Sequence, residues 1–308
     1  MGRVAFLFAG QGAQYPGMGQ SLYERSAAAR EVFDEAERLR PGTRAQCFAG
    51  DKEALSLTIN TQPCLMATDC ACAAALMEAG MRPDGLAGFS LGEIAALPFA
   101  GLLSFAEAFR LVTRRAALMQ ACAERVDSGM VAVLKLDDAA VEALCGLHGA
   151  YAVNYNSPGQ GVCALRRADM PAFADAVKAR GGRALSLAVS GGFHSPFMHE
   201  AAVEMAQRAQ GLPFAAPALP LYANRSCEPY TAQDAPTLLG EQIESPVRWT
   251  TLIRCMLADG FTDFVEVGAG KTLSGLVTRI GGARFVTNVE NAETLAATIQ
   301  TFKEAKPC

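Results

Sequence analysis

Long hydrophobic runs are missing from this chain of 308 residues. The apolar segment from Val4 to Ala9 is much shorter than the roughly 20 apolar residues that a membrane-spanning helix needs. It has neither a basic start nor a small-residue cleavage site, which argues against a signal peptide. We therefore expect no membrane partner, and we interpret this segment as a buried first strand.

A strong charge of one sign is missing as well, and so are the cysteine patterns of metal and redox sites. The net charge of −4 argues against wholesale binding to nucleic acid or to an anionic membrane. The 10 cysteines include no C-x-x-C pair, and no histidine–carboxylate spacing suggests a metal. Cys64, Cys70 and Cys72 lie in an apolar helical stretch and are typical of small buried residues. We expect a reducing, cytoplasmic setting and no cofactor.

Apolar residues make up 51% of the chain, which is enough for a large core. Strand, turn and helix signals alternate along most of the length, a pattern that predicts an α/β fold with a mainly parallel sheet covered by helices. We expect helices over 20–39 and from Thr61 to Gly80. The capping box from Ser104 to Glu107 opens a third helix, which runs to about Ala123.

The rhythm changes after Gly129, where the order of elements becomes βαββαβ, the ferredoxin-like unit. Its predicted strands and helices are 129–136, 137–147, 151–155, 161–166, 168–180 and 184–188. We interpret this unit as a small subdomain over 127–188, inserted into a hydrolase-like catalytic subdomain made of 1–126 and 189–308.

The sequence Gly88-Phe89-Ser90-Leu91-Gly92 is a G-x-S-x-G pentapeptide between a short apolar strand and a helix-forming run. This is the context of a nucleophile elbow, in which small neighbours allow a tight turn that exposes the serine hydroxyl. The helix N-terminus behind Ser90 would stabilise negative charge. An ordinary glycine-rich turn is the alternative, since the pentapeptide also arises by chance.

A serine hydroxyl needs a base, and the chain has only three histidines. His148 ends a predicted helix, and His199 lies on a helix that begins near Ser195, where a surface position is usual. His194 lies in a loop just before that helix, and loops at the rim of an α/β sheet often carry bases. By elimination, His194 is the candidate base.

Arg114 and Arg115 interrupt the apolar pattern of the helix that Ser104 opens. Adjacent helical residues point about 100° apart, so one arginine can face solvent while the other faces the site. An inward arginine holds a carboxylate through two hydrogen bonds. The alternative is an ion pair or a solvated helix face.

These residues belong to eight segments that resemble the malonyl-CoA:acyl carrier protein transacylase family, in the same order and over nearly the whole chain. The segments are Gly10–Gln14, Thr61–Pro63, Gly88–Glu93, Arg115, Asn154–Gln160, Phe193–Pro196, Pro246–Trp249 and Glu266–Lys271.

The resemblance implies that Ser90 is acylated, that His194 is its base and acid, and that the backbone N–H groups of Gln11 and Leu91 form the oxyanion hole. It further implies an acyltransferase that moves a malonyl group from malonyl-CoA to the phosphopantetheine thiol of acyl carrier protein, for fatty acid or polyketide synthesis. We expect it to act as a monomer.

Three further residues form the substrate-binding set that the resemblance implies: Arg115, Phe193 and Asn156. Phenylalanine just before the base accompanies malonyl selection in related acyltransferases. A backbone carbonyl near position 248 would orient the histidine, in place of a triad carboxylate.

Two departures from the family pattern lie beside the nucleophile. Phe89 replaces the usual histidine, which predicts an altered pocket wall with activity retained. Pro98 lies in the helix that follows Ser90 and is expected to kink or end it.

Two other functions remain open on the sequence alone. A serine esterase or thioesterase would need an acidic triad member and would not need Arg115. A carrier-protein docking module without activity would not need the set of Ser90, His194 and Arg115.

Overall fold

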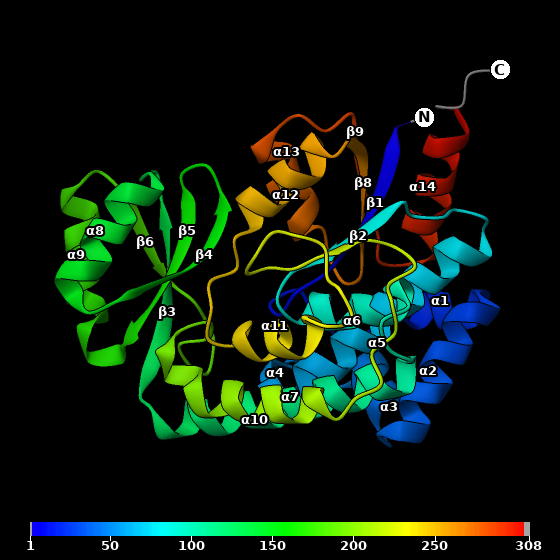
Figure 1. Ribbon diagram of the computed structural model, residues 1–308, viewed down its shortest axis with the longest axis horizontal. Helices are drawn as coiled ribbons and strands as arrows, with labels where there is room; N and C mark the ends of the chain where they lie inside the picture. Colours follow the sequence, from blue (N-terminus) through cyan, green and yellow to red (C-terminus); the bar gives the residue numbers. More distant parts are fainter. Residues whose placement is uncertain (1, 305–308) are drawn as a thin grey trace.

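The structure, a computed structural model, describes residues 2–304 and contains two sheets (Figure 1). Sheet A is parallel, with strand order β7-β2-β1-β8-β9. Its strands are β1 (Arg3–Phe8), β2 (Gly85–Gly88), β7 (Leu221–Tyr222), β8 (Phe261–Val267) and β9 (Phe285–Val289). The α/β class with a mainly parallel sheet is confirmed.

Both faces of sheet A are covered, because successive residues of β1 point into different cores. Phe6 and Phe8 pack with the core on one side, which includes residues of α5 and α6, whereas Ala5 and Leu7 pack with α12 and α13 on the other. This burial on both faces explains why the strand is a continuous apolar run. The helices associated with this part are α1 (Gln20–Arg25), α2 (Ala27–Leu39), α3 (Thr43–Ala49), α4 (Lys52–Ser56), α5 (Thr58–Glu78), α6 (Leu91–Ala100), α7 (Phe105–Arg125), α10 (His199–Gln210), α11 (Ala235–Glu241), α12 (Trp249–Ala258), α13 (Thr272–Ile280) and α14 (Ala292–Glu304).

Sheet B is antiparallel, with strand order β4-β5-β3-β6, and confirms the predicted βαββαβ order. Its elements are β3 (Ser128–Leu134), α8 (Asp138–His148), β4 (Tyr151–Ser157), β5 (Gln160–Arg166), the 3-10 turn η1 (Arg167–Asp169), α9 (Met170–Ala179) and β6 (Arg183–Ser186). These elements lie within 127–188; the division into two subdomains stays a prediction.

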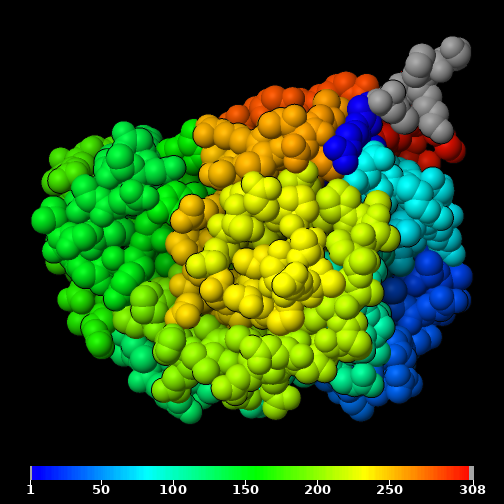
Figure 2. All heavy atoms as spheres, viewed as in Figure 1, coloured from blue at the N-terminus to red at the C-terminus, as the bar shows by residue number. Residues whose placement is uncertain are grey.

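Sheet B joins the main core through alternate residues of its strands. Val131 and Val133 pack with α8 and α9, whereas Met130 points into the core that also contains α5, α6 and α7. Figure 2 shows the lobe over sheet B in green, adjoining the yellow and orange surface of later segments. The region between the two sheets is therefore where residues of both can meet.

Two expected helix boundaries were wrong. The helix expected over 20–39 is broken at Ser26, which is extended and caps α2 by accepting the Ala29 N–H at 3.0 Å. The helix expected from Thr61 begins at Thr58, so that Pro63 lies inside it. Pro98 lies in the last turn of α6, which ends at Ala100, close to where the proline was expected to end it.

No helix within residues 2–304 is long and apolar enough to cross a membrane.

Candidate active site

Ser90 lies between the end of β2 and the start of α6, as the elbow pattern predicts. Its backbone has φ 54° and ψ −102°, a conformation that non-glycine residues seldom adopt. The glycines around it are sterically required. A Cβ on Gly88 would lie 2.0 Å from the backbone carbon of Gly92, and one on Gly92 would lie 2.2 Å from the Phe8 carbonyl oxygen. The turn therefore has the geometry of a nucleophile elbow.

His194 lies in the loop between β6 and η2 (Pro196–Met198), and its Nε2 is 2.7 Å from Ser90 Oγ. Its Nδ1 lies 2.9 Å from the Gln242 carbonyl oxygen and 3.2 Å from that of Ser245. Since a carbonyl only accepts, we assign the proton to Nδ1, which leaves Nε2 free to accept the serine proton. The orienting carbonyls are thus at 242 and 245, before the position near 248 that the resemblance implied.

Burial is the main cause that lowers the pKa of His194, and the positive charge of Arg115 lowers it further, to about 4. The hydrogen bonds to the carbonyls of Gln242 and Ser245 act in the opposite direction. At neutral pH the imidazole is therefore uncharged and can act as a base.

Arg115 projects from α7 into the interior and is fully buried. It donates hydrogen bonds to Gln62 Oε1 at 2.9 Å, to Gln242 Oε1 at 2.8 Å and to Ser90 Oγ at 3.1 Å. Burial lowers its pKa to about 10, so the guanidinium remains charged at neutral pH. Arg114 points outward and pairs with Glu204, so the two adjacent arginines face different ways, as the helical spacing predicts.

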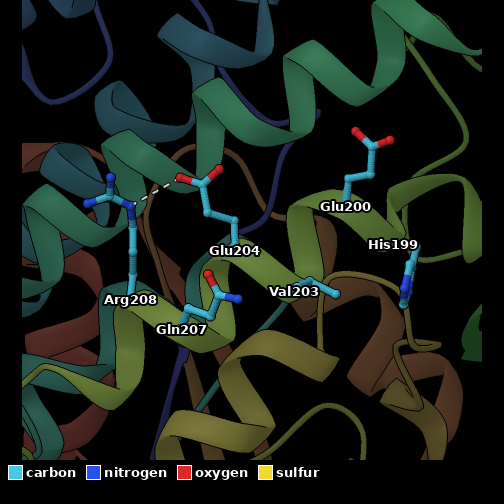
Figure 3. A pocket seen from close by; sticks show the side chains of 6 residues that line it. All are labelled: His199, Glu200, Val203, Glu204, Gln207 and Arg208. Carbon is cyan, nitrogen blue, oxygen red and sulfur yellow. Dashed lines mark hydrogen bonds and ion pairs between the residues drawn. The ribbon is translucent and has the colours of Figure 1, made fainter.

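The other two histidines are used elsewhere. His148 ends α8 and packs edge-on against Phe173, with ring centroids 5.9 Å apart. His199 lies at the end of a separate surface depression of about 590 Å³ along α10 (Figure 3). Its Nδ1 is 2.8 Å from Glu244 Oε2. His194 is therefore the histidine that the fold brings to the serine.

A small cavity of about 90 Å³ opens beside Ser90 between the two sheets. Its lining residues are Gln11, Phe89, Ser90, Met119, Met130, Asn154, Leu187, Val189, Phe193 and His194. The apolar side chains among them limit the room for an acyl group. Sequence reasoning missed Asn154, which lies two residues before the predicted Asn156; Asn156 is buried but does not line this cavity.

Phe89 forms part of the cavity wall and packs against Trp249, with ring centroids 5.4 Å apart. It also lies against the loop after β1: a Cβ on Gly10 would come within 2.8 Å of the Phe89 carbonyl oxygen. The apolar ring thus occupies an apolar niche, whereas the family's usual histidine would present polar atoms there.

The predicted oxyanion donors lie at this site in different elements. Gln11 follows β1 and lines the cavity, while Leu91 is the first residue of α6, directly after Ser90. Within residues 2–304, neither backbone N–H has a hydrogen-bond acceptor. Gln11 lines the cavity, whereas Leu91 is fully buried beside Ser90, so the oxyanion hole stays a prediction.

A polar network behind the nucleophile was missed in the sequence. Asn224 Oδ1 accepts the Ser90 N–H at 2.7 Å, and Gln242 Nε2 donates to the Ser90 carbonyl at 2.8 Å. Both residues also donate to the carboxylate of Glu93. Glu93 is the only charged residue of α6, a signal that could have found it.

Residues 5–301 match the family model described as Acyl transferase domain. The malonyl CoA-acyl carrier protein transacylase of Bacillus subtilis is 37% identical over 312 residues, covering 99% of this chain and 98% of the relative. The chain belongs to the malonyl-CoA–acyl carrier protein transacylase family. Membership in this transacylase family makes it an acyltransferase.

Solved structures of transacylases have the same fold. The transacylase of Clostridium perfringens superimposes with a TM-score of 0.94 at 32% identity, covering 98% of each chain. A malonyl-transacylase solved in complex with a type II PKS acyl-carrier protein gives a TM-score of 0.93 at 32% identity, covering 97% of this chain and 99% of that one.

Proposed function

We propose that this protein transfers a malonyl group from malonyl-CoA to the phosphopantetheine thiol of acyl carrier protein, through a malonyl ester of Ser90. The observation that carries the proposal is the convergence on one hydroxyl: Ser90 Oγ lies 2.7 Å from His194 Nε2 and 3.1 Å from a terminal nitrogen of Arg115. The names of the relatives and the carrier complex support the same reaction.

In the first half-reaction, Arg115 binds the free carboxylate of the malonyl group and places its thioester over Ser90. His194 Nε2 takes the hydroxyl proton while Ser90 Oγ bonds to the thioester carbon. The N–H groups of Gln11 and Leu91 stabilise the resulting oxyanion. The C–S bond then breaks, and the imidazolium returns its proton to the leaving coenzyme A thiolate.

The second half-reaction runs the same steps with a new thiol. His194 takes the proton of the phosphopantetheine thiol, and the sulfur bonds to the malonyl carbon. The C–O bond to Ser90 breaks, and the serine oxygen recovers a proton from the imidazolium. The sequence is ping-pong, and the small apolar cavity supports it because water must be kept from the ester.

An esterase or thioesterase is less well supported. Such an enzyme would pair Nδ1 of the histidine with a carboxylate, whereas here Nδ1 faces two carbonyls. It would also not need a buried arginine at the nucleophile.

The nine cysteines of the described residues are free thiols, which supports the expected cytoplasmic setting.

The test is to trap the intermediate. Incubation of the full chain with malonyl-CoA alone should add one malonyl group, found by mass spectrometry on the peptide that contains Ser90. Addition of acyl carrier protein bearing phosphopantetheine should move the label to its thiol. Ser90→Ala should carry no label. Two results would contradict the proposal: a label on cysteine, or hydrolysis of malonyl-CoA to free malonate at a rate that does not depend on carrier protein.

A further inference from the structure

Glu93 is a buried carboxylate directly beneath the nucleophile turn. It lies three residues after Ser90 in α6, and only 1% of its surface is exposed. It does not line the cavity beside Ser90 and is not placed to touch an acyl group there. A buried carboxylate is costly unless its oxygens accept hydrogen bonds, so its partners indicate what it does.

Three donors converge on this carboxylate. Glu93 Oε2 accepts from Gln242 Nε2 at 2.9 Å and from the Asn224 N–H at 3.1 Å, and Oε1 accepts from the Tyr230 hydroxyl. Burial raises the pKa of Glu93 to about 7, and these hydrogen bonds together with the charge of Arg115 oppose that rise. Every partner of the Glu93 carboxylate named here is thus a hydrogen-bond donor or a positive charge.

The bond to Gln242 determines which way its amide points. Gln242 Nε2 donates both to Glu93 and to the Ser90 carbonyl, so the amide nitrogen is committed on that side. The amide oxygen is consequently turned toward Arg115 and accepts from it at 2.8 Å. A flipped amide would place N–H groups against the guanidinium. The carboxylate therefore acts on Arg115 through one intervening side chain.

The same carboxylate supports the nucleophile turn through Asn224. The side chain of Asn224 accepts from the Ser90 N–H at 2.7 Å and donates to the Gly88 carbonyl at 2.6 Å. Its own backbone N–H is held by Glu93. Loss of this support should affect every acyl donor equally. Loss of the Gln242 contact should weaken transfer most for the donors that need Arg115, because Arg115 loses its acceptor there.

We propose that Glu93 is a positioning residue for substrate selection: by fixing the Gln242 amide it holds Arg115 ready for the carboxylate of the acyl group. The inference rests on the proposed function. Arg115 is also held by Gln62, so the effect of losing Glu93 should be smaller than that of losing the arginine itself.

The measurement is the ratio of kcat/KM for malonyl-CoA to that for acetyl-CoA in wild type and in three variants. Glu93→Leu removes the acceptor at similar size, and Glu93→Asp keeps a carboxylate but withdraws it from Gln242. Both should lower the ratio about tenfold, the effect of one lost buried hydrogen bond. Glu93→Gln still offers an oxygen to Gln242 and should keep the ratio within about threefold, while the Tyr230 hydroxyl turns to accept.

Glu266→Gln is the matched control. Glu266 is also a buried carboxylate at sheet A, but it accepts from the N–H groups of Leu273 and Ser274 at the start of α13. Its loss should leave the ratio unchanged. A merely structural role of Glu93 would lower both rates together, so a wild-type ratio in folded Glu93→Leu or Glu93→Asp overturns the inference. Malonyl labelling of wild-type Ser90, run alongside, reports separately on the proposed function.

Discussion

Replacing Arg115 by alanine should separate recognition of the carboxylate from the acyl-transfer chemistry. In the structure this guanidinium is fully buried and makes hydrogen bonds of 2.8 to 3.1 Å to two glutamine side chains and to Ser90. Without it, the malonyl carboxylate enters a largely dry site unpaired, a loss of roughly 2–5 kcal/mol. Since about 1.4 kcal/mol is a factor of ten, malonyl transfer should fall about 10²-fold or more.

Acetyl transfer has no carboxylate to place and should be spared or improved. Arg115 also lowers the pKa of His194, so its removal should raise that pKa from about 4. As the solution is acidified, His194 is then protonated, and no longer acts as a base, at a higher pH than in wild type. In the alanine variant, the acid limb of the acetyl kcat/KM profile should therefore move to higher pH.

The assay compares kcat/KM for malonyl-CoA and acetyl-CoA with the same carrier protein. Arg114→Ala is the matched control, because this neighbour on α7 pairs with Glu204 at the surface. It should leave both rates near wild type. Equal losses for both acyl donors in Arg115→Ala would refute the reasoning and make Arg115 a structural residue.

Three further predictions concern the nucleophile pair, the buried carboxylate and the carrier surface. His194→Ala should lower the rate of malonyl transfer by about 10³- to 10⁶-fold, and the double variant with Ser90→Ala should lower it little further, because the pair acts as a unit. Losses that add up in steady-state kinetics would contradict this. Because burial raises the pKa of Glu93 to about 7, its protonated form stabilises the fold at low pH, and this stabilisation is lost as the pH rises through about 7. In wild type the free energy of unfolding should therefore decline by about 2 kcal/mol between about pH 5.5 and 8.5 on account of Glu93, and Glu93→Gln should remove that decline in urea denaturation. The same pH dependence in variant and wild type would contradict the prediction. Arg166 and Arg180 are exposed at sheet B and would attract acidic groups on a docked carrier protein. Reversing both to glutamate should therefore raise the KM for carrier protein, most at low salt, while acylation by malonyl-CoA is unchanged. Unaltered carrier kinetics at low ionic strength would place docking elsewhere.

Features with a local steric or hydrogen-bonding cause could be predicted from the sequence. The nucleophile turn needs glycine where a Cβ would strike backbone four or five residues away, or the neighbouring strand. The capping box of α7 needs only Ser104 and Glu107, and both of its hydrogen bonds are present. Burial of Arg115 rather than Arg114 was left open by the helical spacing and was decided by the neighbouring elements.

The polar support of the site could not be predicted, because it joins segments far apart in the sequence. Glu93 meets Asn224 and Gln242 across separations of 131 and 149 residues. The carbonyls that orient His194 come from the backbone, which carries no residue signature. The break at Ser26 had a local cause, but a serine inside a helical pattern can cap a helix or simply continue it.

Ser90 and His194, the proposed nucleophile and base, have backbones in the left-handed half of conformational space, with φ 54° and φ 59°. Each such non-glycine conformation costs of order 1–3 kcal/mol, which the rest of the fold must offset. Ser90→Gly should therefore be inactive yet at least as resistant to heat as the wild type. Selection of random variants for thermal survival alone would enrich proteins that have lost their reaction, so any programme of stabilisation must select for turnover at the same time.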